Sequence, residues 1–301
     1  MVPSAMLFAG GWHEIILPSL RAGAGTILPT WFHRITRREH VASQYETVDA
    51  ALQYRRAYAD NCMEGRLRRE RVGRILDLLA DSPGGRLLDG GSGPGVLARS
   101  LLQSRRHDFD VTVLDQSPAM IEQCVDKAAG GEGLHAYVGD LESLPFADGS
   151  FDVSVVTGAL EYTNARTAIS ELSRVTRSGG MVIISMLNPL SPYQLTQWLL
   201  FWPVLRILGV IEKVFGLRPG RCHGAQKSGI RAIRRSALRE IMREDKLTEV
   251  EVVYLAPTVL VPPLDRIPAV TRRADQVAPA LAALRLTPWL ATAYLVVARR
   301  R

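Results

Sequence analysis

The chain has 301 residues, of which 47% are hydrophobic and 22% are charged. This length and composition are those of a globular protein with a full hydrophobic core, and they exclude a disordered chain, a fibre or a repeat array. The 37 Lys and Arg residues exceed the 30 Asp and Glu residues, so the net charge is +7. That charge favours acidic small molecules, nucleic acid or an anionic membrane surface as partners. Because no binding motif for nucleic acid accompanies it, we expect no nucleic-acid partner.

The cysteines and the first residues indicate the cellular setting. Three cysteines, Cys62, Cys124 and Cys222, are too few and too scattered for a disulfide framework, and none belongs to a CxxC pair. We therefore expect no metal site, and a reducing, cytoplasmic setting. The N-terminal residues do not match a signal peptide, because no basic segment precedes their apolar residues and Glu14 lies among them.

Residues 1–80 are expected to form a helical N-terminal arm or cap. Residues 1 to about 40 show no clean period, whereas residues from about 42 to 80 show a helical one with arginines opposite the apolar face. The apolar positions of that face are Leu67, Val72, Ile75, Leu76 and Leu79. The run Asp81-Ser82-Pro83-Gly84-Gly85 ends the helix.

Short β-rich runs alternate with helical patterns over residues 81–190, which predicts an α/β core with a parallel sheet. The expected strands cover residues 86–90, 110–115, 134–140, 151–158 and 181–187. Helices are expected over 96–103, from Pro118 onward with Ser117 as its cap, and over 167–176.

Two insertions interrupt the remainder of the chain. The first covers residues 191–235 and precedes a helix, capped by Ser236, and a strand over 248–256. The second covers about 258–288 and precedes the last strand, so residues 236–301 complete the core. Two insertions at one end of a sheet are where substrate lids are commonly built.

The stretch LLDGGSGPG, Leu87 to Gly95, places bare backbone between the first strand and its helix, where a ligand can approach the helix N-terminus. A phosphate-binding P-loop is excluded, because no lysine follows Gly95. The dinucleotide fingerprint GxGxxG fails as well, because Val96 occupies its last position.

What remains, Asp89-x-Gly91-x-Gly93-x-Gly95, resembles motif I of the class I S-adenosylmethionine (SAM)-dependent methyltransferases. The resemblance implies that Asp89 and the loop backbone, Gly90 included, receive the methionyl end of SAM. Asp115 closes the second strand, and a carboxylate there can accept both hydroxyls of a ribose, although the same residue would suit NAD. In this family the positions of Gln116 and Met120 often pack against the adenine and ribose, while a core role suits Met120 equally.

Asp140 distinguishes between these cofactors. The resemblance implies that it accepts the adenine amino group and that the backbone N–H of Leu141 faces the ring. The segments LPFADGSFDVSVV and ELSRVTRSGG resemble the methyltransferase type 11 subgroup, with Ser178 where proline is usual. The resemblance covers about residues 87–186, and it implies a Rossmann-like, seven-stranded, mostly parallel sheet that ends in a hairpin-like pair.

The methyl end of the cofactor is expected beside Thr157, Gly158 and Ala159, which follow the fourth strand at the ligand-binding edge of the sheet. Glu161 and Tyr162 either touch the acceptor or are exposed residues of a first helical turn. Methyl transfer mainly requires alignment, so no catalytic residue is assigned. A base at His223 and a surface loop histidine both remain open, and His13, His33 and His40 carry weaker signals.

The aromatic residues of the first insertion are Tyr193, Trp198, Phe201, Trp202 and Phe215. This stretch is interpreted as a buried or oligomer-forming face, a roof over a hydrophobic acceptor, or a helix lying on a membrane. Its most apolar part, residues 198–210, is expected to be too short and too interrupted, by Pro203 and Arg206, to span a bilayer. In the N-terminal segment, Tyr45, Tyr54 and Tyr58 are candidates to close over the cofactor.

The expected function is SAM-dependent methylation of a small, largely apolar metabolite such as a polyketide, terpenoid or quinone. Two alternatives remain open: a protein of the same fold that binds SAM without methylating, and an NAD-dependent oxidoreductase. A homo-oligomer and peripheral membrane contact also remain open.

Overall fold

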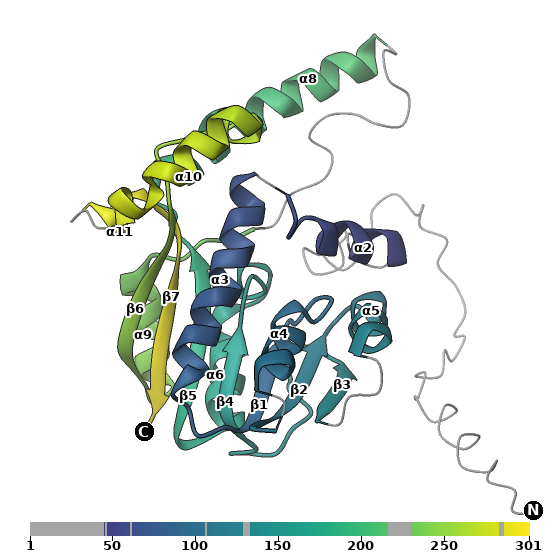
Figure 1. Cartoon of the computed structure of the whole chain (residues 1–301), viewed down its shortest axis with the longest axis vertical. Helices are drawn as coiled ribbons and strands as arrows, with labels where there is room; N and C mark the ends of the chain where they lie inside the picture. Colours follow the sequence, from purple (N-terminus) through teal and green to yellow (C-terminus); the bar gives the residue numbers. More distant parts are fainter. Residues whose placement is uncertain are drawn as a thin grey trace, which may run out of the picture. The chain divides into compact units, whose positions relative to one another are not determined.

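The computed structural model describes residues 45, 47–60, 62–105, 107–128, 133–215, 230–282 and 286–301. Its centre is a seven-stranded sheet in the order β3-β2-β1-β4-β5-β7-β6 (Figure 1). The strands are β1 (Gly85–Gly90), β2 (Phe109–Asp115), β3 (Leu134–Val138), β4 (Phe151–Val156), β5 (Thr176–Leu187), β6 (Leu247–Pro257) and β7 (Ala291–Arg300).

Strands β1 to β5 pair in parallel, and β7 runs antiparallel to both β5 and β6. The expected Rossmann-like, mostly parallel sheet with a hairpin-like last pair is therefore confirmed. The strand order reverses at β1, which has β2 on one side and β4 on the other. Open α/β sheets bind ligands at the carboxyl ends of the strands beside such a switch point.

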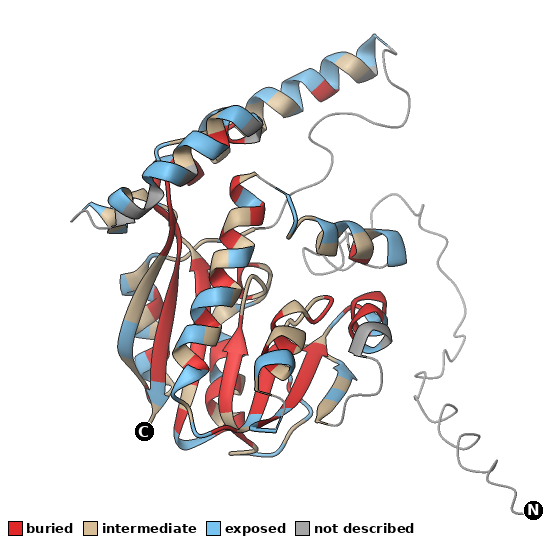
Figure 2. Ribbon diagram, in the orientation of Figure 1, coloured by how far each residue is buried: buried red, intermediate tan, exposed pale blue. Residues whose placement is uncertain are grey.

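Helices cover both faces of the sheet. On one face, α3 (Met63–Ala80), α4 (Val96–Ser104) and α5 (Pro118–Ala128) share a hydrophobic cluster with the strands. On the other face, α6 (Ala165–Val175) and α9 (Arg235–Glu244) form a second cluster. The central strands are buried almost throughout (Figure 2), and each fully buried aliphatic side chain contributes about 1.5–3 kcal/mol to folding.

The helical segment expected from about residue 42 to 80 consists of two helices, α2 (Val48–Arg56) and α3, with a break between them. Gly65 makes the break possible: a Cβ there would lie 2.2 Å from the carbonyl oxygen of Asp60 and 2.8 Å from that of Ala57. The Arg69 guanidinium then holds the turn by donating to the carbonyl oxygens of Tyr58 at 2.6 Å and Asp60 at 2.9 Å.

Two other boundaries differ from the expected ones. Helix α9 begins at Arg235 with Arg234 as its N-cap and no side-chain cap bond, so the expected capping by Ser236 is wrong. Strand β5 begins at Thr176, which pairs with Phe151, and the ladder resumes where Met181 pairs with Val153. Strand β5 thus starts five residues before the expected strand over 181–187, and its pairing with β4 contains a bulge between these two points. By contrast, Ser117 caps α5 as expected, because its Oγ accepts the N–H of Met120 at 3.2 Å.

Residues 192–214 of the first insertion fold as one helical stretch made of α7 (Pro192–Thr196), the π-helical turn η3 (Gln197–Phe201) and α8 (Trp202–Val214). Pro203 does not interrupt it, because the proline falls in the first turn of α8, just after the Trp202 N–H bonds the Gln197 carbonyl across the wider π turn. Within the described residues, Pro192–Glu212 is long and apolar enough to cross a membrane, by length and composition alone. The helix is thus longer than the apolar run of residues 198–210, and Pro203 and Arg206 do not interrupt it.

The second insertion contains η4 (Leu264–Arg266), α10 (Pro268–Ala282) and α11 (Thr287–Leu290). A buried hydrogen bond ties it to the first insertion, because the Tyr193 hydroxyl donates to Asp265 Oδ2 at 2.9 Å. The short helix η2 (Leu160–Tyr162), which follows β4, completes the elements near the carboxyl edge of the sheet.

Candidate functional site

The glycine loop between β1 and α4 is built for close approach. Gly91, Gly93 and Gly95 all have positive φ, at 67°, 54° and 69°. A Cβ on Gly91 would lie 2.2 Å from the Cβ of Ala159, and one on Gly95 would lie 2.1 Å from Cys124 Sγ. Both the backbone conformation and the space therefore exclude side chains at these two positions.

Asp115 at the end of β2 holds this loop in place. One carboxylate oxygen accepts the N–H of Gly93 at 2.8 Å, and the other accepts the N–H of Ser117 at 2.9 Å. Burial raises the pKa of the Asp115 carboxyl, while these two backbone bonds lower it. Each carboxylate oxygen has about two acceptor sites, so the group can also receive two hydroxyls of a ligand.

Asp89 at the end of β1 is 1% exposed, and neither carboxyl oxygen has a hydrogen-bond partner among the described residues. Burial, and then the charge of Asp115, raises the pKa of Asp89 to about 7. A buried carboxylate without partners is costly, and an arriving cation would relieve that cost. The side chain is therefore suited to a positively charged group of a ligand.

Asp140 follows β3 and shapes the next turn. Its Oδ1 accepts the N–H of Glu142 at 3.0 Å, and its backbone carbonyl accepts the N–H of Ser143 at 3.1 Å. Leu141 is buried against the loop, because a Cβ on Gly90 would lie 2.6 Å from Leu141 Cδ2. Gly90 thus lets the turn after β3 pack closely against the end of β1.

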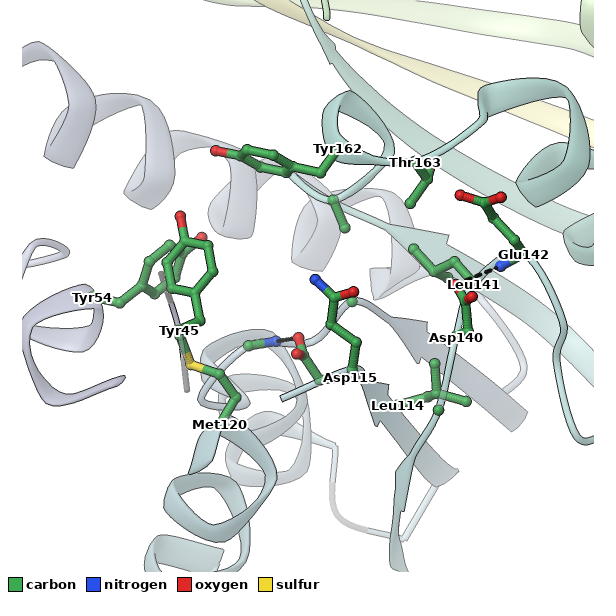
Figure 3. A pocket seen from close by; sticks show the side chains of 16 residues that line it. Tyr45, Tyr54, Leu114, Asp115, Met120, Asp140, Leu141, Glu142, Tyr162 and Thr163 are labelled. Atoms are coloured by element: carbon green, nitrogen blue, oxygen red, sulfur yellow. Dashed lines mark hydrogen bonds between the residues drawn. The ribbon is translucent and has the colours of Figure 1, made fainter. Parts of the chain in front are cut away.

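A cavity opens over these strand ends, and we call it the glycine-loop cavity (Figure 3). Of the predicted cofactor residues, those lining it are Gly91, Gly93, Asp115, Gln116, Met120, Asp140, Leu141 and Gly158. Asp89, Gly90, Gly95 and Thr157 are not among its lining residues, and the first two lie within β1. Figure 3 shows Asp115 and Asp140 on adjoining sides of the cavity, with Tyr45 and Tyr54 facing them.

Tyr45 and Tyr54 come from the N-terminal segment and close this cavity, whereas Tyr58 does not line it. Their ring centroids are 5.8 Å apart in an edge-on arrangement, and the Arg68 guanidinium lies 4.3 Å from the Tyr54 centroid. The Ser117 hydroxyl donates to the Tyr45 carbonyl oxygen at 2.6 Å. The cap of α5 therefore anchors the segment that carries Tyr45.

A second cavity, the insertion cavity, adjoins the first and shares Tyr54, Gly158 and Tyr162 with it. Its other lining residues include Met63, Glu64, Leu67, Arg68 and Arg71 of α3, Glu161 of η2, and Leu187, Tyr193, Gln194, Gln197, Trp198 and Trp202. It therefore combines aromatic and aliphatic walls with a small set of polar side chains.

Two charged residues of the insertion cavity are buried. Glu161 is 2% exposed, so it is not the exposed first-turn residue that remained open from the sequence. Burial raises the pKa of Glu161, and the nearby Arg71 guanidinium opposes that rise. Arg71 is 8% exposed, and a Cβ on Gly158 would lie 2.6 Å from its Nη1.

Arg71 was missed because the arginines of this helix were placed on its solvent face. Its position gives a signal, because Arg71 lies four residues after Leu67 and four before Ile75 and so occupies the same stripe as these two buried residues. His13, His33, His40 and His223 lie outside the described residues. Within the described part of the chain, no group of three or more His, Cys, Asp or Glu residues could hold a metal ion.

Comparisons with known proteins agree with this arrangement. Residues 88–184 match the family model of the methyltransferase domain. The chain is 31% identical over 132 residues to an uncharacterized methyltransferase, YodH, of Bacillus subtilis, covering 42% of this chain and 55% of that protein. It is 30% identical over 162 residues to the ubiquinone/menaquinone biosynthesis C-methyltransferase UbiE of Cereibacter sphaeroides, covering 52% and 60%. The chain thus spans somewhat more than half the length of these two curated relatives.

Solved structures show the same fold. A Haloferax volcanii methyltransferase, solved with its Trm112 activator, superposes with a TM-score of 0.55 at 19% identity, covering 84% of this chain and 97% of that one. Geranyl diphosphate C-methyltransferase of Streptomyces coelicolor gives a TM-score of 0.51 at 18% identity, covering 86% and 84%. Residues 88–184 therefore match the methyltransferase domain family, and the described chain shares the fold of these solved methyltransferases.

Proposed function

We propose that this chain is a methyltransferase that binds SAM in the glycine-loop cavity and its acceptor in the insertion cavity. The observation that carries the proposal is that the two cavities meet at Tyr54, Gly158 and Tyr162. Methyl transfer is an in-line displacement, so the donor and the nucleophile must be held in adjoining sites that share an opening.

The nucleoside half of SAM fits the outer part of the glycine-loop cavity. Asp115 would accept the two ribose hydroxyls, with its orientation already held by the N–H groups of Gly93 and Ser117. Asp140 and the Leu141 N–H would bind the edge of the adenine, next to Gln116 and Met120. A carboxylate that is held before the ligand arrives loses little further freedom on binding.

The methionyl half fits the glycine loop and the end of β4. The buried Asp89 carboxyl lacks a partner and suits the ammonium group, and Gly90, Gly91, Gly93 and Gly95 leave backbone accessible. Thr157 and Gly158 follow β4 and would border the reacting end of the cofactor. When bound, SAM supplies a methyl group activated by its positively charged sulfur.

The insertion cavity supports a small acceptor with an apolar body and one ionisable group. Trp198, Trp202 and Leu67 provide apolar walls, while Arg71 and Glu161 provide charge. We propose Glu161 as the group that accepts the proton lost by the acceptor, since burial raises its pKa and makes its carboxylate a stronger base than an ordinary glutamate. Two similar proteins are named for different reactions, one as a ubiquinone/menaquinone biosynthesis C-methyltransferase and one as a malonyl-[acyl-carrier protein] O-methyltransferase. Since these names differ, the acceptor class proposed here rests on the cavity alone.

We also propose a cytoplasmic location. Cys62 and Cys124 are free thiols, and Cys124 is buried beside the glycine loop, where a Cβ on Gly95 would touch its sulfur. Free thiols of this kind are typical of a reducing compartment.

The test is to measure SAM and NADH binding by calorimetry and then to incubate the chain with methyl-labelled SAM and a metabolite extract. Binding of SAM with transfer of label to a small molecule supports the proposal. Binding of SAM without transfer to any acceptor would instead indicate a non-methylating protein of this fold. Binding of NADH but not SAM would indicate an oxidoreductase.

A further inference from the structure

The helical stretch Pro192–Val214, here called the insertion helix, has a mostly solvent-facing surface. Of its most apolar 18-residue window, 11% is buried within the protein. Leu199 is 76% exposed and Val214 is 73% exposed. Other large apolar side chains exposed along the helix are Leu195, Leu200, Val204, Ile207, Leu208, Val210 and Ile211.

A helix on the surface of a soluble protein normally turns charged and polar residues outward. The insertion helix carries three charged residues, Arg206, Glu212 and Lys213, and the last two lie at its end. Its outward surface is therefore apolar over most of its length, and contiguous apolar surface of this kind marks a binding face.

The inward side of the same helix is engaged by the protein. Gln194, Gln197, Trp198 and Trp202 line the insertion cavity, and their spacing of three and four residues places them on one side. Gln194 is also buried. If the helix left the body to span a membrane, it would remove one wall of the cavity, so this geometry favours a helix that lies along a membrane surface.

The second insertion adds further exposed apolar side chains beside the insertion helix. It is joined to the insertion helix by the Tyr193 to Asp265 hydrogen bond and by contacts between α7 and α11. Val259, Leu264, Ile267 and Trp289 are all exposed there. Figure 1 shows α8, α10 and α11 at one end of the molecule, away from the C-terminus. Tryptophan is enriched where proteins meet the lipid headgroups, so the exposed Trp289 favours a lipid surface as the partner of this region.

Positive charge follows the insertion helix in the sequence. Residues 218–243 contain eight basic residues and a single acid, Glu240. Arg235 and Arg239 form ion pairs with Glu249, so their charge is largely used within the fold. Arg231 and Arg234 belong to the same basic run, at the end of the first insertion. Basic residues next to an apolar face are attracted to anionic lipid headgroups at short range.

We propose that the insertion helix docks this protein on an anionic lipid bilayer, lying in the interface with Leu199, Ile207 and Val210 toward the acyl chains. The docking does not depend on the proposed methyl transfer. Where that function also holds, the insertion cavity lies directly beside the lipid, and the acceptor would be an amphiphile that enters from the membrane.

The experiment is flotation of the full chain with phosphatidylcholine vesicles, prepared with and without phosphatidylglycerol. We expect binding that requires phosphatidylglycerol and weakens at high salt, because anionic headgroups are screened by salt. The double variant Leu199→Glu/Ile207→Glu should lower the vesicle partition coefficient at least about tenfold, because two charges enter the apolar face. Val250→Glu on β6 is the matched control, because Val250 is 62% exposed on a different surface.

Retained SAM affinity in the double variant shows that the core is folded and separates this test from that of the proposed function. Failure of the full chain to float, or an equal loss in Val250→Glu, overturns the proposal. Resistance to alkaline extraction would instead assign a spanning helix. A dimer that dissociates in the double variant while vesicle binding persists would assign the face to a second copy of the chain.

Discussion

The Asp115 carboxylate at the end of β2 accepts the N–H of Gly93 at 2.8 Å, and so links β2 to the glycine loop that follows β1. The same side chain therefore positions the loop and faces the glycine-loop cavity. Because of this dual role, a change at Asp115 is expected to affect both ligand binding and the position of the glycine loop.

Asp115→Ala is expected to weaken SAM binding by about 1.5–3 kcal/mol, since it removes a charged acceptor. Titration calorimetry measures the dissociation constant directly. Asp110→Ala is the control, because Asp110 lies near the start of the same strand and pairs with His135 at 2.8 Å, away from the cavity. An unchanged dissociation constant in Asp115→Ala would remove the ribose assignment.

Asp89 predicts a pH effect on the ligand-free protein. Its pKa is raised by burial from an ordinary value of about 3.9 to about 7, so the folded state holds a proton that the unfolded state releases over this range. This contribution to stability is fully present below pH about 4 and is lost as the pH rises to about 7. Asp89→Asn should remove that decline and be more stable than the parent by about 1–3 kcal/mol above pH 7.

Urea unfolding of the parent and Asp89→Asn at about pH 5 and about pH 8 measures the difference between them. Asp77→Asn is the control, because the Asp77 side chain is 71% exposed and the substitution should leave the free energy of unfolding close to that of the parent. If parent and Asp89→Asn lose stability equally over this interval, Asp89 is not the titrating group.

Much of the cofactor-binding core could be predicted, because its signals are local. The alternation of strands and helices specifies a parallel sheet, and the acids at strand ends reach the same edge whatever the loops do. The break before α3 was not predictable in this way, because it depends on the carbonyl oxygen of Asp60 occupying the space beside Gly65. Tyr45 was one of three candidate tyrosines, and its placement depends on a bond from Ser117, 72 residues away in the sequence.

The insertions were harder for a different reason. Pro203 was interpreted as an interruption, yet the π turn before it allows the helix to continue. Such a turn is a backbone adjustment without a residue signature. Arg71 was placed in solvent from its charge, although its register with Leu67 already pointed inward. For Arg71, the charge of the side chain indicated solvent, whereas its position in the helix indicated burial.

Gly95→Ala tests how closely the glycine loop packs against Cys124 of α5. The added Cβ would meet Cys124 Sγ at 2.1 Å on a backbone with φ of 69°, so we expect a loss of about 1–3 kcal/mol in the free energy of unfolding. Gly73→Ala is the control, because nothing lies within 4 Å of a Cβ there and the residue sits within α3. That control should be neutral or stabilising by up to about 1 kcal/mol, and a comparable loss in both variants would contradict the steric account.

Glu161 and Arg71 make the last prediction, which concerns the proposed proton transfer. Because the ionised Glu161 is the base, kcat should rise with pH through its raised pKa, and Glu161→Gln should lower kcat by about 10²–10⁴-fold while leaving SAM affinity unchanged. Arg71→Gln removes the charge that opposes this rise, so it should move the acid limb of the kcat profile to higher pH. A structural role for the pair would change stability without moving that limb. Pre-steady-state rates of methyl transfer across the pH range, with unfolding measured in parallel, separate the two outcomes.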